Sequence, residues 1–177
     1  MSKHELRKKM RAIFPLPPHL RAGKSRCICD VIAALPQWEG AGVVAIFAPQ
    51  EREPDVELLW ECASGRKFGY PRIDGEELEL FSVLSPSELR PAQWGIREPV
   101  GLPENLIAPR EVDIVLVPGV AFTRGGLRCG RGGGFYDRLL AALPEGVLKI
   151  GVCFSEQLVD DLPTEPHDRA VDLVISA

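Results

Sequence analysis

The stretch "VDIVLVPGVAFTRGGLRCGRGGGFYDRLL", residues 112 to 140, joins an apolar run to a glycine-rich loop and then to an amphipathic segment. The run 112–119 is typical of a central strand in a parallel sheet, because such a strand is buried on both faces. The segment from Phe135 onward has helical spacing. Ligands of open α/β sheets bind beyond the carboxyl ends of the strands, so the loop between strand and helix is a candidate binding site.

The rest of the chain repeats this alternation of strands and helices. We expect helices over about residues 2–14, 19–35, 53–63 and 135–143, and strands over about 43–48, 67–71, 78–84, 148–154 and 171–176. The Pro- and Gly-rich segment 85–109 is expected to be a loop with little regular structure. The pattern predicts a single α/β domain, residues 1–177, with three layers: a mostly parallel central sheet and helices on both faces.

Composition narrows the class of protein. Hydrophobic residues make up 45% of the chain, charged residues 26%, and the formal net charge is −4, which argues against a general nucleic-acid binder. No apolar stretch approaches the roughly 20 residues of a membrane span, and the basic N-terminal segment is not followed by the apolar region of a signal peptide. The five cysteines form no C-x-x-C pair, so we expect buried free thiols. We therefore expect a cytoplasmic monomer that binds small molecules, with no nucleic-acid or membrane partner.

The glycine-rich loop has the composition of a phosphate site. Seven glycines lie from Gly119 to Gly134, and four arginines accompany them, at positions 124, 128, 131 and 138. Glycines let backbone N–H groups approach a ligand closely, and the N-terminus of the following helix adds a positive dipole end. Arginine suits bidentate contacts with phosphate. A flexible surface loop with solvated arginines is the alternative, and the position between strand and helix favours phosphate binding.

Two standard glycine motifs do not fit. "PHLRAGKS" (18–25) ends like a Walker A sequence, but Pro18 stands where the first glycine belongs and no strand precedes it, so it is interpreted as a solvated helix. The loop gives G-x-G-x-G at 130–134, with Phe135 where a dinucleotide fingerprint needs its last glycine. NAD binding is not supported.

Nucleotide phosphates usually bring Mg²⁺, held by one or two carboxylates. Asp137 follows the loop in the first turn of the expected helix, where it could equally stabilise the helix dipole. Asp168 and Asp172 precede the last expected strand, where solvated turn residues are the alternative. The pattern alone leaves these roles open.

The central motif resembles the signature of the 5-formyltetrahydrofolate cyclo-ligase family, also called methenyltetrahydrofolate synthetases. The similarity extends in order and spacing to "KHELR" near the start, "EREPD" after the first strand, "WGIREP" mid-chain and "PHDRAVDLVIS" at the end. The resemblance implies Mg²⁺- and ATP-dependent conversion of 5-formyltetrahydrofolate, a reduced folate, to 5,10-methenyltetrahydrofolate. ATP would phosphorylate the formyl oxygen, N10 would attack the formyl carbon, and ADP and phosphate would be released.

The resemblance also implies residue roles. ATP would be bound by Lys3, Arg7, Arg128, Cys129, Gly130, Arg131, Gly132, Gly133, Gly134, Phe135, Tyr136 and Asp137. Arg128 and Arg131 would stabilise the transferring phosphoryl group, with Tyr136 as a further catalytic candidate. Mg²⁺ would be held by Asp137 and Asp168, and the folate would be bound by Glu53, Trp94 and Tyr136. Without the resemblance, Lys3 and Arg7 would be interpreted as solvated, Glu53 as a helix-start charge and Trp94 as a packing residue.

Four residues depart from the pattern common in the family: Thr123, Cys129, Arg131 and Phe135. None removes a group that the chemistry requires, and they leave substrate preference open. For Cys129, a thiolate stabilised by the cationic loop is possible, but apolar packing is favoured. Two other functions remain as alternatives: a non-catalytic protein that binds a nucleotide or phosphorylated metabolite, and an ATP-dependent kinase or ligase acting on another amide-bearing heterocycle.

Overall fold

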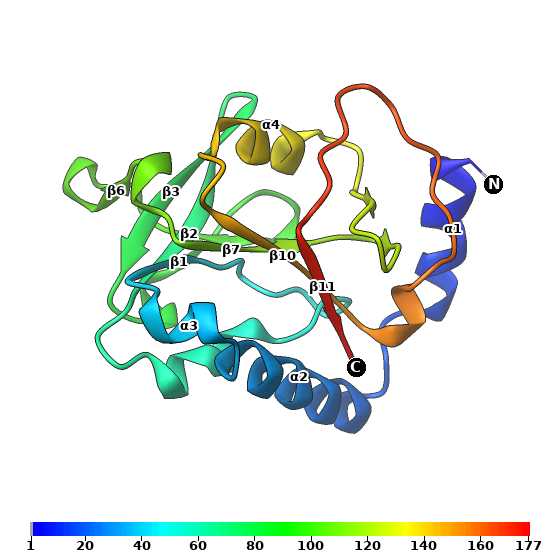
Figure 1. Cartoon of the computed structure of the whole chain (residues 1–177), viewed down its shortest axis with the longest axis horizontal. Helices are drawn as coiled ribbons and strands as arrows, with labels where there is room; N and C mark the ends of the chain where they lie inside the picture. The colour runs from blue at the N-terminus through cyan, green and yellow to red at the C-terminus, as the bar shows by residue number, and fades with distance from the viewer. Residues whose placement is uncertain (1) are drawn as a thin grey trace.

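A computed structural model describes residues 2–177 and contains a seven-stranded sheet with the strand order β11-β10-β7-β1-β2-β3-β6 (Figure 1). The first five strands in that order run parallel, and the last two are antiparallel to their neighbours. The bounds are β1 (Val43–Ala45), β2 (Lys67–Asp74), β3 (Glu77–Val83), β6 (Leu106–Ile107), β7 (Ile114–Pro118), β10 (Leu148–Cys153) and β11 (Leu173–Ser176). The predicted mostly parallel sheet is confirmed.

Helices cover both faces of this sheet, as predicted (Figure 1). One face carries α2 (Pro18–Ala33), α3 (Pro36–Gly40) and the 3₁₀ helix η1 (Val56–Cys62), and the other carries α4 (Phe135–Ala142). Successive side chains of β7 point to opposite faces of the sheet, which explains how one strand packs against helices in both outer layers. Ile114 and Leu116 belong to the same apolar cluster as Ile28 of α2, whereas Val115 and Val117 belong to the cluster of the α4 face.

The first helix, α1 (Lys3–Ile13), lies beyond the carboxyl ends of the parallel strands rather than on a face (Figure 1). A capping box starts it: the Ser2 hydroxyl accepts a bond from the Glu5 N–H at 3.2 Å, and the Glu5 carboxylate accepts one from the Ser2 N–H at 2.7 Å. Leu6 and Met10 are buried and hold the helix against the core. The same helix presents Lys3 and Arg7 one turn apart.

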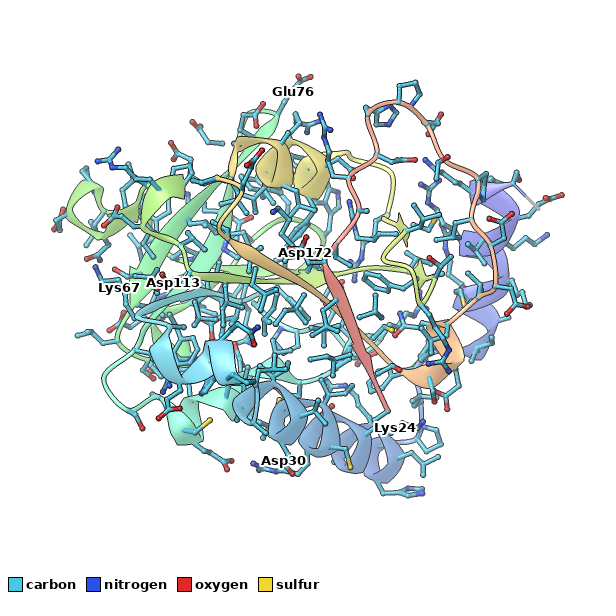
Figure 2. All side chains as sticks on the ribbon, in the orientation of Figure 1. Lys24, Asp30, Lys67, Glu76, Asp113 and Asp172 are labelled. Atoms are coloured by element: carbon cyan, nitrogen blue, oxygen red, sulfur yellow. The ribbon has the colours of Figure 1, made fainter. Side chains whose placement is uncertain are left out.

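At the amino ends of the strands, two carboxylates accept hydrogen bonds from backbone N–H groups; Asp113 and Asp172 are labelled in Figure 2. Asp113 accepts hydrogen bonds from the N–H groups of Gly42 and Val43, at 2.8 and 2.9 Å, and so joins β7 to the start of β1. Asp172 does the same for Lys149 in β10, at 2.8 Å. These bonds therefore satisfy backbone N–H groups at the amino ends of the strands, whereas the candidate site lies at the carboxyl ends.

Two expectations require correction. The helix expected over about residues 53–63 is the 3₁₀ helix η1, which starts only at Val56, where Asp55 caps it. It ends at Cys62, close to the expected end, before the positive φ angles of Ser64 and Gly65. The segment 85–109 is irregular, as expected, but it also supplies the edge strand β6. Its other short elements are η2 (Pro86–Glu88), β4 (Arg90–Pro91), η3 (Gln93–Gly95), β5 (Arg97–Glu98) and η4 (Pro103–Asn105).

The remaining elements are η5 (Pro109–Glu111), the hairpin β8 (Ala121–Phe122) and β9 (Arg128–Cys129), and η6 (Ser155–Gln157). Within residues 2–177, no helix has the length and apolar character needed to cross a membrane. The "PHLRAGKS" segment lies in α2, which confirms its helical interpretation. Lys24 in it pairs with Glu156, and the Ser25 hydroxyl is buried and accepts a bond from the Asp55 N–H.

Candidate active site

A cavity of about 650 Å³ lies at the carboxyl ends of β1, β2 and β7. It is lined by residues from the start of α1, the glycine loop and the segment 165–168 near the end of the chain. Every site residue predicted from the sequence lines this cavity except Cys129. Residues from both ends of the sequence therefore meet around one hollow.

The glycine loop leaves the β8–β9 hairpin and enters α4 through a left-handed residue. Gly134 is the N-cap of α4 with φ +69°, a conformation that favours glycine. Gly126 in the hairpin turn has φ +92°, and a Cβ there would lie 2.2 Å from the Val171 carbonyl oxygen. This close approach packs the hairpin turn against the segment that carries Asp168.

Arg128 and Asp137 join the two ends of the loop. The Arg128 side chain is only 4% exposed, and its Nη2 donates to Asp137 Oδ1 at 2.7 Å. The same oxygen accepts the Arg169 N–H at 3.1 Å, which places Asp137 close to Asp168 in space. The Arg128 guanidinium also lies 5.8 Å from the centre of the Tyr136 ring. Its buried Nε has no hydrogen-bond partner among the described residues.

Lys3 connects the start of α1 to the end of the chain. Its ammonium donates to both oxygens of Asp168, at 2.7 and 2.8 Å, and to Glu165 at 2.6 Å. Burial by itself disfavours the charged forms of Lys3 and Asp168, but their mutual contacts have the larger combined effect. The hydrogen bonds to Asp168 and Glu165 raise the pKa of Lys3, and the hydrogen bond from Lys3 lowers the pKa of Asp168. One turn further along α1, Arg7 Nε donates to the Gly130 carbonyl at 2.8 Å and holds the loop against the helix.

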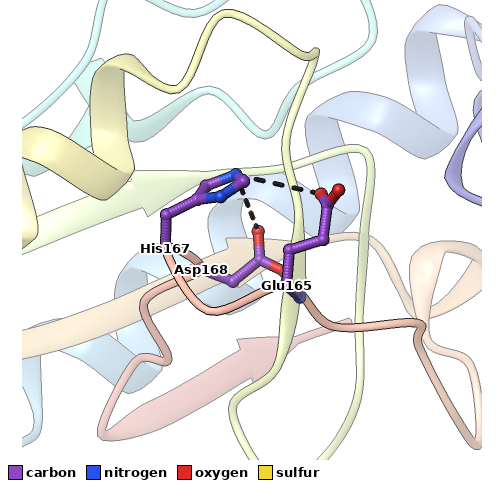
Figure 3. A group of neighbouring side chains, drawn as sticks. All are labelled: Glu165, His167 and Asp168. Carbon is purple, nitrogen blue, oxygen red and sulfur yellow. Dashed lines mark hydrogen bonds and ion pairs between the residues drawn. The ribbon is translucent and has the colours of Figure 1, made fainter.

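Glu165 and His167 were missed from the sequence. Ligand atoms of Glu165, His167 and Asp168 lie within 4.8 Å of one another (Figure 3). His167 Nε2 lies 3.8 Å from Glu165 and 3.9 Å from Asp168. Their proximity to Asp168 within "TEPHD" (164–168) is the sequence signal that marks them.

Glu53 lies across the cavity from the loop. Its side chain is 10% exposed, and Oε1 accepts from Arg131 Nη2 at 2.7 Å while Oε2 accepts from the Gln50 N–H at 2.9 Å. Arg131 also donates to the side-chain oxygen of Gln50. Gln50 was not predicted from the sequence, since a single glutamine after a strand carries no distinctive pattern.

Aromatic side chains complete the cavity wall. Trp94 has φ +57° and is 66% exposed, so it is not the packing residue that the alternative supposed. Its ring centre lies 6.4 Å from that of Phe135. Burial raises the pKa of the Tyr136 phenol above its ordinary value. Together these rings form a partly open surface suited to a flat heterocycle.

Cys129 is buried, and its thiol does not line the cavity. Burial raises the pKa of the thiol despite the nearby Arg7, Lys3 and Arg128. The structure therefore supports apolar packing and not a reactive thiolate. Any contact of Cys129 with a ligand would have to come from its backbone.

Comparison with known proteins identifies the family. A sequence model of the 5-formyltetrahydrofolate cyclo-ligase family matches residues 1–177. A 5-formyltetrahydrofolate cyclo-ligase of Mycolicibacterium smegmatis is 42% identical over 170 residues, which cover 91% of this chain and 86% of the relative. The NMR structure of Aquifex aeolicus 5,10-methenyltetrahydrofolate synthetase superposes with a TM-score of 0.87 at 34% identity, covering 99% of this chain and 90% of that one. A Mycoplasma pneumoniae 5,10-methenyltetrahydrofolate synthetase shares the fold, with a TM-score of 0.80 at 24% identity, covering 99% of this chain and 98% of that one. With its whole described length matched and its glycine loop, basic helix and carboxylates around one cavity, the chain belongs to the 5-formyltetrahydrofolate cyclo-ligase family.

Proposed function

We propose that this protein converts 5-formyltetrahydrofolate and ATP to 5,10-methenyltetrahydrofolate, ADP and phosphate. The observation that carries the proposal is the composition of the cavity. One wall is a cationic glycine loop at a helix N-terminus, and the facing wall holds the shielded carboxylate of Glu53 beside exposed aromatic surface. Phosphate-binding and heterocycle-binding groups therefore face each other across one hollow.

In this proposal the triphosphate binds at the loop. The backbone of Gly130–Phe135 and the N-terminus of α4 supply N–H groups and a positive dipole end. Lys3, Arg7 and Arg131 supply positive charge at the cavity wall. Arg128 is held in place by Asp137 and supports the charge that develops during phosphoryl transfer.

The folate binds on the Glu53 side. A carboxylate suits the amino and ring N–H groups of a pterin, because it accepts two parallel hydrogen bonds. Trp94 and Tyr136 line the same cavity and supply the rings for contact with the flat heterocycle. This places the N5-formyl group between Glu53 and the loop.

The reaction requires a leaving group that a formamide does not have. Transfer of the γ-phosphoryl group from ATP to the formyl oxygen makes that oxygen part of a phosphate ester and releases ADP. N10 then attacks the formyl carbon and loses its proton, and the carbon–oxygen bond breaks as phosphate departs. The protein contributes mainly by positioning the two substrates and stabilising negative charge.

We further propose Asp137 and Asp168 as the residues that hold Mg²⁺. Carboxylate oxygens are the ligands that Mg²⁺ prefers. Among residues 2–177, Oδ2 of Asp137 makes no hydrogen bond, so that oxygen is available. Both oxygens of Asp168 bond to Lys3, which would have to turn toward the triphosphate. When bound, Mg²⁺ would neutralise phosphate charge.

The proposal includes a monomeric enzyme in the cytoplasm that uses small-molecule substrates and needs no nucleic acid. The site residues that line the cavity come from a single chain, which supports the proposal of a monomer. The five free thiols suit a reducing compartment. Analytical ultracentrifugation of the purified protein tests whether it is a monomer.

The deciding experiment mixes purified protein with ATP, Mg²⁺ and 5-formyltetrahydrofolate and follows the near-ultraviolet absorbance of the methenyl product. The expected result is product formation that stops when ATP is omitted, with ADP formed in equal amount. ATP-independent product, or none from folded protein at any substrate concentration, would overturn the proposal. Binding of ATP without its consumption would indicate a nucleotide-binding protein instead, and ADP formation only with another amide-bearing heterocycle would indicate a different ligase or kinase.

A further inference from the structure

The side chain of Arg131 spans the cavity from the glycine loop to the opposite wall. There it bonds to Glu53 Oε1 at 2.7 Å and to the side-chain oxygen of Gln50. The two partners of the ion pair are separated by 78 residues in the sequence. The ion pair thus bridges the two halves of the site.

This bridge occupies the carboxylate assigned above to the pterin. In the free protein both carboxylate oxygens of Glu53 already have a donor, because Oε2 accepts from the Gln50 N–H and Oε1 accepts from Arg131. The pair also neutralises the negative charge that would attract the pterin N–H groups. A folate entering the free protein must therefore compete with Arg131.

Of the two partners, Arg131 is the one able to move. Its side chain is 51% exposed, and its neighbours are Gly130 and Gly132, of which Gly132 has φ +110°. Glu53 is only 10% exposed and is fixed by a turn: its N–H donates to the Gln50 carbonyl at 3.0 Å, and its own carbonyl accepts from Arg21 at 3.1 Å.

A second cavity of about 650 Å³ adjoins the first, between α1 and the segment Pro49–Glu53. Both cavities are lined by Gln50, Glu53 and Arg131. The bridge therefore lies on their common boundary.

Resting on the proposed function, we propose that Arg131 is a positioning residue that makes folate binding depend on nucleotide. A triphosphate at the loop carries several negative charges close to Arg131 and competes with the single charge of Glu53. When Arg131 turns to the phosphates, Glu53 Oε1 becomes available to the pterin. Because linkage is reciprocal, folate bound at Glu53 also makes Arg131 available to ATP.

The experiment measures the Kd of 5-formyltetrahydrofolate by calorimetry, with and without a saturating non-hydrolysable ATP analogue and Mg²⁺. For the unaltered protein the analogue is expected to tighten folate binding about fivefold, the size of one partly exposed ion pair. In Arg131→Gln, folate should bind about fivefold tighter than to the unaltered protein when no nucleotide is present, and the analogue should add little. The analogue itself should bind more weakly. Tighter folate binding together with weaker analogue binding would show that Arg131 contacts both Glu53 and phosphate, because loss of a phosphate contact alone would weaken only the binding of the analogue.

Arg110→Gln is the matched control, since Arg110 is exposed and outside both cavities. Arg131→Lys keeps the charge without the planar fork and should show intermediate coupling. Circular dichroism verifies folding of each variant. If folded Arg131→Gln binds folate no tighter than the unaltered protein without nucleotide, the inference is overturned. Failure of the unaltered protein to form methenyl product overturns the proposed function, whereas turnover with unchanged coupling overturns only this inference.

Discussion

Arg128 in β9 and Asp137 in the first turn of α4 form a shielded ion pair at 2.7 Å across the glycine loop. The pair fixes both ends of the loop while leaving the residues between them at the cavity wall. Because the Arg128 side chain is 4% exposed, it cannot reorient in the way that Arg131 can. The loop therefore combines one buried arginine with one that is half-exposed.

Arg128→Lys is expected to lower kcat/KM by about a hundredfold, because lysine retains the charge but not the planar fork that reaches Asp137 and a phosphate together. The methenyl absorbance assay measures the loss. Arg110→Lys, on the exposed surface, should retain full activity. Activity within threefold of the unaltered protein in Arg128→Lys would contradict the assigned role.

Glu53→Gln should raise the KM for 5-formyltetrahydrofolate about tenfold or more with a smaller change in kcat, because an amide offers one acceptor oxygen where the carboxylate offers two. Steady-state kinetics at saturating ATP tests this. An effect on the KM for ATP with none on the KM for folate would place Glu53 outside the pterin site.

Gly126→Ala is expected to lower the free energy of unfolding by at least about 2 kcal/mol, because alanine is strained at φ +92° and its Cβ would meet the Val171 carbonyl oxygen. Urea unfolding gives the value. The neighbouring Gly125→Ala is the control: its Cβ has only the Thr123 hydroxyl nearby, at 3.9 Å, so a change within about 0.5 kcal/mol is expected. Equal changes in the free energy of unfolding at both positions would show that the close approach of Gly126 to the Val171 carbonyl does not contribute to stability.

The contacts between Lys3 and Asp168 predict a pH dependence of stability. The pKa of Asp168 is lowered in the folded state, so its contribution is present above its ordinary value of 3.8 and is lost as the pH falls through the folded value. The pKa of Lys3 is raised, so its contribution is complete below 10.5 and is lost as the pH rises through the folded value.

Lys3→Met should therefore reduce stability by about 1 kcal/mol near neutral pH and by less in strong acid, where Asp168 is protonated. Urea unfolding across this range measures the difference. Lys8→Met on the exposed side of α1 is the control and should show no such pH-dependent loss. A Lys3→Met effect that is constant from neutral pH to strong acid would contradict the ion pair.

Thiol labelling tests the packing around the cysteines. The five cysteines are free, as expected, but only Cys29, Cys129 and Cys153 are buried, whereas Cys27 is exposed and Cys62 is half-buried. Burial raises the pKa values of Cys29 and Cys153 to about 12. Cys27 should react fastest with a disulfide reagent, and the three buried thiols only on unfolding. Cys27→Ser should remove the fastest phase. Rapid labelling of Cys129 in the folded protein would contradict its packing.

The sequence by itself determined the fold class and the place of the glycine loop between a central strand and a helix. The apolar run 112–119 is continuous because β7 is buried on both faces, and its alternating side chains pack against α2 and α4. Glycine spacing likewise reports local backbone needs, as at Gly134. The apolar run and the glycine spacing depend only on residues that are neighbours in the chain, so both can be recognised from the sequence without knowledge of the fold. Local propensity misjudged the segment after Pro54, which begins only at Val56, after the Asp55 cap, and forms the 3₁₀ helix η1.

Only the tertiary structure decided which charges meet. Lys3 and Asp168 lie 165 residues apart in the sequence, and Arg131 and Glu53 lie 78 apart, yet both pairs are in direct contact. Ion pairing depends on distance in space, which is set by the course of the parallel sheet and by α1 packing across its carboxyl end. No local pattern records that course. The cluster of arginines can be seen in the sequence. The pairing of Arg128 with Asp137 and of Arg131 with Glu53 can be seen only in the tertiary structure.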